Sequence, residues 1–317
     1  MRLLVTGGAG FIGSNFVNYW LLKYPDDSLI NVDKLTYASN PEYVKHHIFG
    51  SRYKLVREDI TNREVMDDLV KKSDVVVNFA AESHVDNSIA SAEPFVRSNY
   101  FGVFNILESV RRYDVQFHQV STDEVYGSLP LDSDRKFTES SAYNPRNPYS
   151  ATKAAADHLI RSYINTYGIH ATISNSSNNF GPYQHREKLI PKTIINAMNN
   201  RKIPVYGDGS QVRDWLYVED HCSAIEKIIL SKNYGETYLV SAENERRNID
   251  VVTSILRILG KSKDLIEFVD DRPGHDVRYA LDPSKLKRHL SWKAVHSFES
   301  ALKSTVEHYV NNLNLYI

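Results

Sequence analysis

Three consecutive side chains near the middle of the chain could move protons. Thr122, Asp123 and Glu124 follow the apolar run 115–120, a pattern typical of a strand that enters a loop. Ligands of open α/β sheets bind just past the carboxyl ends of the strands. A hydroxyl and two carboxylates at this place are therefore candidates for acid–base catalysis.

Tyr149 and Lys153 form a second candidate group. Asn147 and Pro148 precede them and can begin a helix, on which residues four apart share one face. Tyrosine with its ordinary pKa near ~10 is a poor base at neutral pH, but an ammonium one turn away favours the phenolate. The same spacing is common on surface helices, so the pair alone leaves both interpretations open.

The N-terminal segment has the pattern of a dinucleotide-binding turn. Strand residues 3–6 lead into Gly7, Gly10 and Gly13, and an apolar helix pattern follows. These glycines allow a tight turn, a close approach to a pyrophosphate and helix–strand packing, with the helix N-terminus facing the phosphates. A second strand ends at Asp33, 20 residues past Gly13, where a carboxylate can bind an adenosine ribose and repel a 2′-phosphate. We predict NAD as the cofactor; the alternative is a flexible glycine loop beside an incidental aspartate.

Strand and helix patterns then alternate, which predicts an α/β protein with a doubly wound parallel Rossmann sheet. The expected strands cover 53–56, 74–81, 115–120 and 169–175, and the expected helices cover 62–72, 94–113 and 149–167. After residue 175 the chain becomes polar and rich in turns. We predict an NAD-binding Rossmann domain over 1–177 with a return segment over 211–240, and a smaller mixed α/β substrate domain over 178–210 and 241–317.

Arginines spread over the loops of the second half, together with Tyr206, suit a nucleoside diphosphate, because guanidinium groups bind phosphates and an aromatic ring can lie against a base. Any one of these arginines could equally be a solvated surface residue. His84, in a loop after a predicted strand, is expected to be a structural neighbour rather than a catalytic group.

Composition limits the compartment and the partners. With 42% hydrophobic and 24% charged residues and a net charge of −1, the chain gives no electrostatic reason to bind nucleic acid or an anionic membrane. Cys222 is the only cysteine, which excludes an intrachain disulfide and a cysteine-based metal cluster. The strand pattern at the N-terminus predicts no signal peptide, and no apolar run reaches the ~20 residues of a membrane span. We predict a cytoplasmic protein with no metal.

Several longer motifs resemble one family closely. The chain resembles the extended short-chain dehydrogenases/reductases over essentially its whole length and, within them, the dTDP-glucose 4,6-dehydratases. The glycine loop and the Tyr-x-x-x-Lys pair mark only the superfamily. The discriminating motifs are Asp-Lys-Leu-Thr-Tyr at 33–37, Ala-Glu-Ser-His-Val-Asp at 81–86, Ser-Thr-Asp-Glu-Val-Tyr-Gly at 121–127, Asn-Asn at 178–179, Glu-Lys-Leu-Ile-Pro at 187–191 and Asp-Arg-Pro-Gly-His-Asp at 271–276.

The resemblance implies a reaction and a role for each residue of the two candidate groups. Tyr149, helped by Lys153 and Thr122, would take the C4 hydroxyl proton of dTDP-glucose while a hydride passes to NAD. Glu124 would remove the C5 proton and Asp123 would protonate the departing C6 hydroxyl. Return of the hydride to C6 would give dTDP-4-keto-6-deoxyglucose, a precursor of rhamnose and other deoxysugars.

The resemblance also implies two binding sites and an assembly. Related enzymes are homodimers through the helices expected here at 94–113 and 149–167. The NAD site would comprise Gly7, Gly10, Phe11, Ile12, Gly13, Asp33, Lys34, Thr36, Asp59, Ile60, Ala80, Ala81, Ser83, Ser98, Tyr149, Lys153 and Asn179. The substrate site would comprise Ser83, Thr122, Asn178, Lys188, Leu189, Pro204, Tyr206, Arg213, Asn248, Arg272 and His275.

Two other functions remain open at this stage. An NAD-dependent UDP-sugar 4-epimerase or decarboxylase would share the cofactor site, but epimerisation needs neither a leaving-group acid like Asp123 nor a C5 base like Glu124. A non-catalytic dinucleotide-binding protein often loses Tyr or Lys from the catalytic pair, whereas this chain keeps both.

Overall fold

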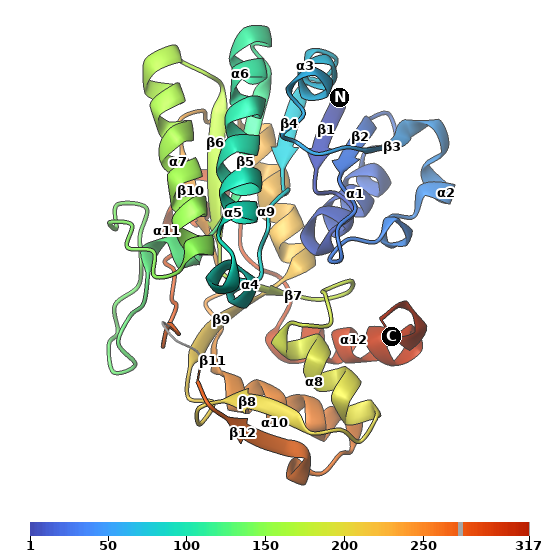
Figure 1. Cartoon of the computed structure of the whole chain (residues 1–317), viewed down its shortest axis with the longest axis vertical. Helices are drawn as coiled ribbons and strands as arrows, with labels where there is room; N and C mark the ends of the chain where they lie inside the picture. Colours follow the sequence, from blue (N-terminus) through green and yellow to red (C-terminus); the bar gives the residue numbers. More distant parts are fainter. Residues whose placement is uncertain (272–274, 317) are drawn as a thin grey trace.

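A parallel sheet of seven strands forms the centre of the larger part of the molecule (Figure 1), seen here in a computed structural model that describes residues 1–271 and 275–316. The strand order is β10-β6-β5-β4-β1-β2-β3, with every neighbouring pair parallel. The strands are β1 (Arg2–Thr6), β2 (Ser28–Asp33), β3 (Tyr53–Arg57), β4 (Val75–Asn78), β5 (Gln116–Thr122), β6 (Ala171–Ser176) and β10 (Thr237–Val240). The predicted doubly wound fold is confirmed.

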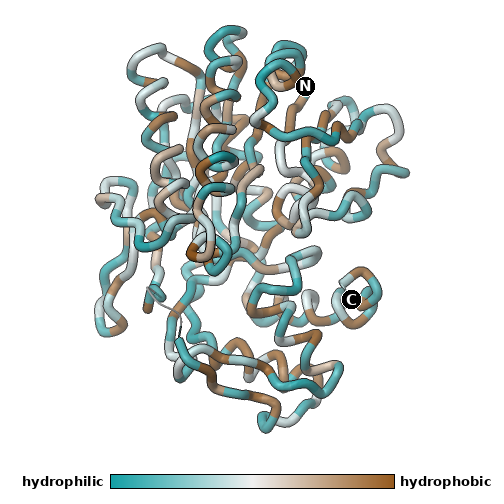
Figure 2. Tube along the Cα trace, viewed as in Figure 1, coloured by the Kyte–Doolittle hydropathy of each residue, from teal (hydrophilic) through white to brown (hydrophobic). Residues whose placement is uncertain are grey.

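Helices cover both faces of this sheet, because successive strand residues point to opposite sides. Leu3 and Val5 pack toward α1 (Phe11–Lys23) and α9 (Val218–Ser231). Leu4 packs toward the helices α3 (Arg63–Lys71), α6 (Val103–Tyr113) and α7 (Pro148–Tyr167) on the other face. Figure 2 shows hydrophobic residues gathered along the central strands and hydrophilic ones on the outer loops.

The remaining elements form a smaller mixed α/β part next to the carboxyl ends of the large sheet (Figure 1). Its strands form a three-stranded sheet, β11-β9-β7, and a two-stranded sheet, β12-β8. The strands are β7 (Asn178–Phe180), β8 (Ile203–Tyr206), β9 (Val212–Tyr217), β11 (Glu245–Arg247) and β12 (Ile266–Val269). The helices are α8 (Leu189–Met198), α10 (Asn248–Leu259) and α12 (Phe298–Asn311). α11 (Ser284–Leu290) packs on β10 and α9 of the larger part, and the short α2 (His46–Phe49), α4 (Val85–Ala90) and α5 (Glu93–Phe95) belong to its loops.

Three local predictions differ from the structure. The expected helix 94–113 is interrupted by η3 (Val96–Gly102), a π-helical segment in which Gly102 lies so close to Ile60 that a side chain would clash there. The strand expected to end at Val120 continues through Thr122, so Thr122 stands on β5 itself. The segment around Pro204, expected to be a turn, forms β8, since Ile203 and Val205 point into a hydrophobic cluster.

Within the described ranges, every helix is too short or too polar to cross a lipid bilayer.

Candidate active site

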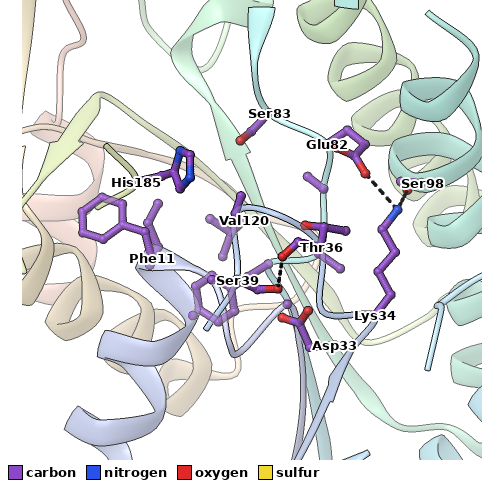
Figure 3. Close-up of a pocket in the computed structure, with 18 of the residues that line it drawn as sticks. Phe11, Asp33, Lys34, Thr36, Ser39, Glu82, Ser83, Ser98, Val120 and His185 are labelled. Carbon is purple, nitrogen blue, oxygen red and sulfur yellow. Dashed lines mark hydrogen bonds and ion pairs between the residues drawn. The ribbon is translucent and has the colours of Figure 1, made fainter. Parts of the chain in front are cut away.

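One cavity lies at the carboxyl ends of β1, β2 and β4, and the glycine turn forms part of its wall. Every residue predicted for the cofactor except Asn179 lines it. Figure 3 shows Asp33 and Phe11 on one side of the cavity, with Ser83 and Glu82 opposite. The cavity is also lined by residues that had not been predicted for the cofactor site: Ser39, Glu58, Glu82, Ser121, Gln184, His185 and Glu187.

The shape of the glycine turn depends on the missing side chains. Gly7 has φ +70°, and a Cβ there would lie 2.6 Å from the backbone nitrogen of Ala80. A Cβ on Gly13 would clash with the carbonyl oxygen of Gly7. Gly10, the N-cap of α1, offers no side chain to bind the first N–H groups of the helix. The turn is thus open to a ligand at a helix N-terminus, where the dipole favours a phosphate.

Two charged side chains face the cavity from the end of β2. The Asp33 carboxylate is held by backbone N–H groups, accepting from Ala9 at 3.0 Å and from Leu35 at 2.8 Å. The Lys34 ammonium crosses the cavity edge to the carboxylate of Glu82 at 2.8 Å and the hydroxyl of Ser98 at 3.1 Å (Figure 3). Contacts within the protein therefore hold both side chains in place.

Asn179 does not line the cavity because its amide is used inside the protein. Its Nδ2 donates to the Ser177 carbonyl at 2.9 Å, and its Oδ1 lies 2.9 Å from Nδ1 of His221. Its backbone carbonyl accepts from Gln184 at 2.9 Å, and Gln184 does line the cavity. Asn179 therefore supports the wall rather than forming it.

The carboxylates after β5 lie on the short helix η4 (Asp123–Tyr126), which Thr122 caps. The Thr122 hydroxyl accepts from the backbone of Glu124 at 3.3 Å and donates to Oδ1 of Asp123 at 3.2 Å. Asp123 is 1% exposed, and its Oδ2 has no hydrogen-bond partner among the described residues. Burial, followed by the neighbouring Glu124, raises the pKa of Asp123 well above its usual value. Asp123 is thus suited to hold a proton.

Tyr149 and Lys153 are both buried at the start of α7, where Asn147 and Ser150 form a capping box. The Lys153 ammonium donates to the carbonyl of Val120 at 2.8 Å. Burial lowers the pKa of Lys153 to about 8. The Tyr-x-x-x-Lys spacing predicted a lowered pKa for Tyr149. In the structure, burial and the nearby Glu124 raise this pKa, while a hydrogen bond from the Thr122 hydroxyl acts to lower it.

A cluster from the smaller part faces the same carboxylates. The Arg213 guanidinium lies 4.3 Å over the ring of Tyr279 and donates to the carbonyl of Asp276 at 2.7 Å. The Tyr279 hydroxyl donates to the Asp276 carboxylate at 2.5 Å. Burial first, and then Glu124, raises the pKa of Tyr279. Tyr279 and Asp276 had not been chosen as site residues: Asp276 ends the motif 271–276 without an expected role, and no local pattern distinguishes Tyr279 from its neighbours.

The residues predicted for the substrate occupy several places. Ser83 and Lys188 line the cavity, and the Lys188 ammonium donates to the Ser83 carbonyl at 3.3 Å. Buried side-chain oxygens of Asn178 and Asn248 have no hydrogen-bond donor among the described residues. Tyr206 on β8 is exposed, Pro204 on the same strand is partly buried, and the Tyr206 ring lies 6.0 Å from that of His275. Leu189 begins α8, and Arg272 lies outside the described residues.

His84 lies at the cavity mouth rather than among the proton-transfer groups. Its Nε2 is 3.7 Å from the carboxylate of Glu187 and 4.0 Å from that of Asp86. His185 reaches the same Glu187 carboxylate at 3.4 Å from the opposite side. These contacts join two loops beside the cavity, which agrees with the structural role expected for His84.

The parallel sheet, its glycine turn and the Tyr–Lys pair on one cavity define a Rossmann-type enzyme of the short-chain dehydrogenase/reductase class. A family model described as GDP-mannose 4,6 dehydratase matches residues 4–305, and the chain belongs to this family. Within it, the chain is 50% identical to the dTDP-glucose 4,6-dehydratase of Mycobacterium tuberculosis, over 98% of this chain and 94% of that relative.

Solved structures agree with this relationship. The dTDP-glucose 4,6-dehydratase of Streptomyces venezuelae, crystallised with NAD bound, is 40% identical with a TM-score of 0.96, over 100% of this chain and 99% of that one. A UDP-glucose 4-epimerase from Thermus thermophilus in complex with NAD is more distant, at 26% identity and a TM-score of 0.90, over 98% of this chain and 100% of that one.

Proposed function

We propose that this protein is an NAD-dependent dehydratase that converts dTDP-glucose into dTDP-4-keto-6-deoxyglucose. The observation that carries the proposal is the position of the Asp123 and Glu124 carboxylates near Tyr149, which itself lines the dinucleotide cavity. Relatives that are 43–50% identical and carry the dehydratase name support the same reaction. Neither an epimerase nor a non-catalytic binding protein would use the buried carboxyl group of Asp123.

The residues around the cavity fit NAD. Gly7 and Gly13 leave a cradle that a Cβ would fill, and α1 points its uncapped N-terminus into it. Asp33 keeps its carboxylate at the end of β2, the position that binds an adenosine ribose and disfavours a 2′-phosphate. When bound, NAD accepts a hydride from C4 of the sugar and later returns it to C6.

Tyr149 takes the proton of the C4 hydroxyl. Thr122 supports this step by its hydrogen bond to Tyr149, and Lys153 supports it by placing an ammonium one helical turn away. Because burial raises the pKa of Tyr149, these two neighbours have to favour the phenolate when the sugar is in place.

The adjacent carboxyls divide the elimination step between them. Asp123 holds a proton, since its pKa is raised by burial, and it protonates the departing C6 hydroxyl. Glu124, which accepts a hydrogen bond from Asn147 at 3.4 Å, removes the C5 proton that the 4-ketone has made acidic. Water leaves, and Glu124 gives the proton back to C5 when the hydride returns.

The smaller part would bind the nucleotide. We assign the NAD-binding domain to 1–177 with 211–240, and the substrate domain to 178–210 and 241–317. The pairing of β10 with β6 in the large sheet supports the return segment, although β9 at its start pairs with β7 and β11 of the smaller part, so Arg213 lies on the side of the substrate. Arg213, buried beside Tyr279, and the unpaired oxygens of Asn178 and Asn248 would face the sugar nucleotide.

We also propose a homodimer formed through η3 and α7. Val96, Tyr100 and Phe101 on η3 are large apolar side chains that are at least 37% exposed, and the first two border a surface depression shared with α7. A second copy that covered them would remove this apolar surface from water. Sedimentation of the wild type against Val96→Asp tests this assembly, and fractionation of cells tests the predicted cytoplasmic location.

The function is tested with purified protein and dTDP-glucose, without added NAD, in deuterated water. We expect a C6 methyl group and deuterium at C5 in the product by NMR. Glu124→Gln should retain bound NAD but lose ~10²–10⁴-fold in turnover and in C5 labelling. Recovery of the C4 epimer without C5 label would support the epimerase instead, and absence of turnover with any nucleotide sugar would support a binding protein.

A further inference from the structure

A fully buried aspartate follows the catalytic pair on the same helix face. Tyr149, Lys153 and Asp157 stand four residues apart on α7, and Asp157 is 0% exposed. No step of the proposed reaction uses this residue. A charge buried this deeply is costly unless neighbouring groups stabilise it, so its partners should show what it does.

The partners of Asp157 come from both strands behind the active site. Its Oδ2 accepts from Ser121 on β5 at 2.8 Å, from Asn175 on β6 at 3.0 Å and from the hydroxyl of Tyr143 at 2.9 Å. Asn175 also donates to the carbonyl of Thr122 at 3.2 Å. Three donors on Oδ2 favour an ionised carboxylate, as do the nearby cations of Lys153 and Arg161, whereas Oδ1 is buried with no hydrogen-bond partner among the described residues. Asp157 thereby connects α7 to the end of β5, directly before the Thr122–Glu124 segment.

Asp157 is also the charge partner of Lys153. Lys153 donates to the carbonyl of Val120, which is neutral, whereas Asp157 one turn away carries the opposite charge. Burial lowers the pKa of Lys153 to about 8, and Asp157 acts against this shift. The pKa of Asp157 is raised by burial, and Lys153 acts against that shift in turn. The two buried charges stabilise each other.

We propose that Asp157 is a positioning residue: its negative charge keeps Lys153 an ammonium, and its hydrogen bonds hold the end of β5 against α7. This inference rests on the proposed role of Tyr149 and Lys153. Without Asp157, Lys153 would lose its proton more easily in the same buried surroundings, and Tyr149 would lose the cation that favours its phenolate. The charge of Asp157 itself raises the pKa of Tyr149, so Asp157 favours the phenolate only through Lys153.

The other groups that face Asp157 do not replace it. Arg161, on the next turn of α7, donates to the Tyr143 hydroxyl at 2.7 Å and is positive, so it cannot support the charge of Lys153. Burial raises the pKa of both Tyr126 and Tyr143, so both stay neutral through the working range. Among the described residues, Asp157 is thus the group whose charge raises the pKa of Lys153.

The test compares Asp157→Asn with Tyr143→Phe. The first variant removes the charge in nearly the same volume, whereas the second removes one hydrogen bond to Asp157 and keeps its charge. At pH 7.5 we expect Asp157→Asn to lose about threefold or more in kcat, with KM for dTDP-glucose changed less than about twofold. Its alkaline loss of kcat should begin about one pH unit lower than in the wild type, whereas Tyr143→Phe should keep the wild-type pH profile.

A second readout does not depend on turnover. In protein labelled with ¹³C at the lysine ε-carbon, the Lys153 signal is assigned by its absence in Lys153→Met. Its titration midpoint should fall in Asp157→Asn, return in Asp157→Glu and stay unchanged in Tyr143→Phe. An unchanged midpoint in Asp157→Asn overturns the inference, even if dTDP-glucose proves to be the wrong substrate. If Asp157→Asn does not fold, Asp157→Ser, which keeps a hydroxyl acceptor without the charge, takes its place.

Discussion

The central sheet supports its two functional regions by different means. β1 and β4, below the dinucleotide cavity, are mostly aliphatic: Leu3 to Val5 on β1 and Val75 to Val77 on β4 are buried in hydrophobic clusters, while the last residue of each strand, Thr6 and Asn78, is polar and buried. The next strands, β5 and β6, lie below the carboxylates and bury more polar side chains. These are Gln116, His118, Gln119, Ser121 and Thr122 on β5 and Thr172, Ser174, Asn175 and Ser176 on β6.

This difference follows from what each half of the sheet has to hold. In the dinucleotide half, backbone atoms form the wall that the cofactor would approach closely. Glycines set the shape of this wall, and the strands below it need only pack against their neighbours. The other half holds Asp123, Lys153 and Asp157 out of water, which requires hydrogen-bond partners throughout. The first half should therefore be sensitive to added volume and the second to lost partners.

Adding one methyl group to the dinucleotide half should have the largest effect. Gly13→Ala puts a Cβ against the carbonyl oxygen of Gly7 and within 2.8 Å of Cα of Gly8, and these backbone atoms cannot move without reshaping the turn. We expect the affinity for NAD to fall about 100-fold. This corresponds to roughly 3 kcal/mol, the cost of moving the backbone of the glycine turn. The measurement is the NAD released on denaturing purified protein, calibrated against the wild type.

Gly168→Ala is the matched control for this prediction. Gly168 also has no side chain, but a Cβ there meets nothing within 4 Å, although its φ of +67° carries some backbone strain. This variant should keep its NAD while losing some stability. Full NAD content in Gly13→Ala would show that the turn tolerates volume, and the contrast between the two halves would then be wrong.

Much of the dinucleotide half could be predicted from the sequence, whereas the polar half could not. A strand, a glycine turn and a helix lie within about twenty consecutive residues, so their spacing alone indicates Gly7, Gly13 and the β1–α1 unit. The sequence also indicated Asp123 and Tyr149 by their local motifs. Nothing local marks the partners of these residues.

The partners that were missed are distant in the chain and come together only through the fold. Tyr279 lies about 150 residues from the carboxylates whose charges affect it, and Asn175 and Ser121 meet at Asp157 through the pairing of two strands. Hydrogen bonds between such segments depend on register, which hydrophobic periodicity does not specify for buried polar strands. The raised pKa of Tyr149 was not foreseen because it follows from burial of the ring, which the Tyr-x-x-x-Lys spacing does not specify.

Removing a hydrogen-bond donor from the polar half should have the next largest effect. Asn175→Leu keeps the volume of the side chain but leaves the Thr122 carbonyl and the Asp157 carboxylate each without one donor. We expect a loss of about 2–3 kcal/mol in the free energy of unfolding, together with reduced turnover. Urea unfolding and steady-state kinetics on the same preparation measure both.

The mirror-image change in the apolar half is Val77→Thr. Val77 is buried on β4 among aliphatic neighbours, so a hydroxyl of the same shape costs about 1–3 kcal/mol of stability. Turnover and NAD content should nevertheless stay close to the wild type, because no proton-transfer group depends on Val77. If Asn175→Leu and Val77→Thr lost turnover equally, the polar strands would contribute to stability but would give no specific support to the proton-transfer groups.

At neutral pH the smallest effect is expected at His118, whose contribution appears only as a pH dependence of stability in the polar half. His118 on β5 lies 2.9 Å from the Thr172 hydroxyl and 3.0 Å from that of Ser174, and burial lowers its pKa to about 3. An unfolded histidine takes up a proton near pH 6.5, whereas this one stays neutral in the folded protein. The unfolded state therefore binds the extra proton, and stability falls as the pH drops from about 6.5 toward 3.

His118→Gln keeps a polar side chain without this titration. Between pH 6 and 4 the stability of this variant should therefore fall less steeply than that of the wild type, and the two slopes should differ by about 1.4 kcal/mol per pH unit. Urea unfolding at several pH values gives both slopes. Parallel slopes would mean that His118 is protonated inside the folded sheet, and the polar half would then carry one more buried charge than its hydrogen bonds indicate.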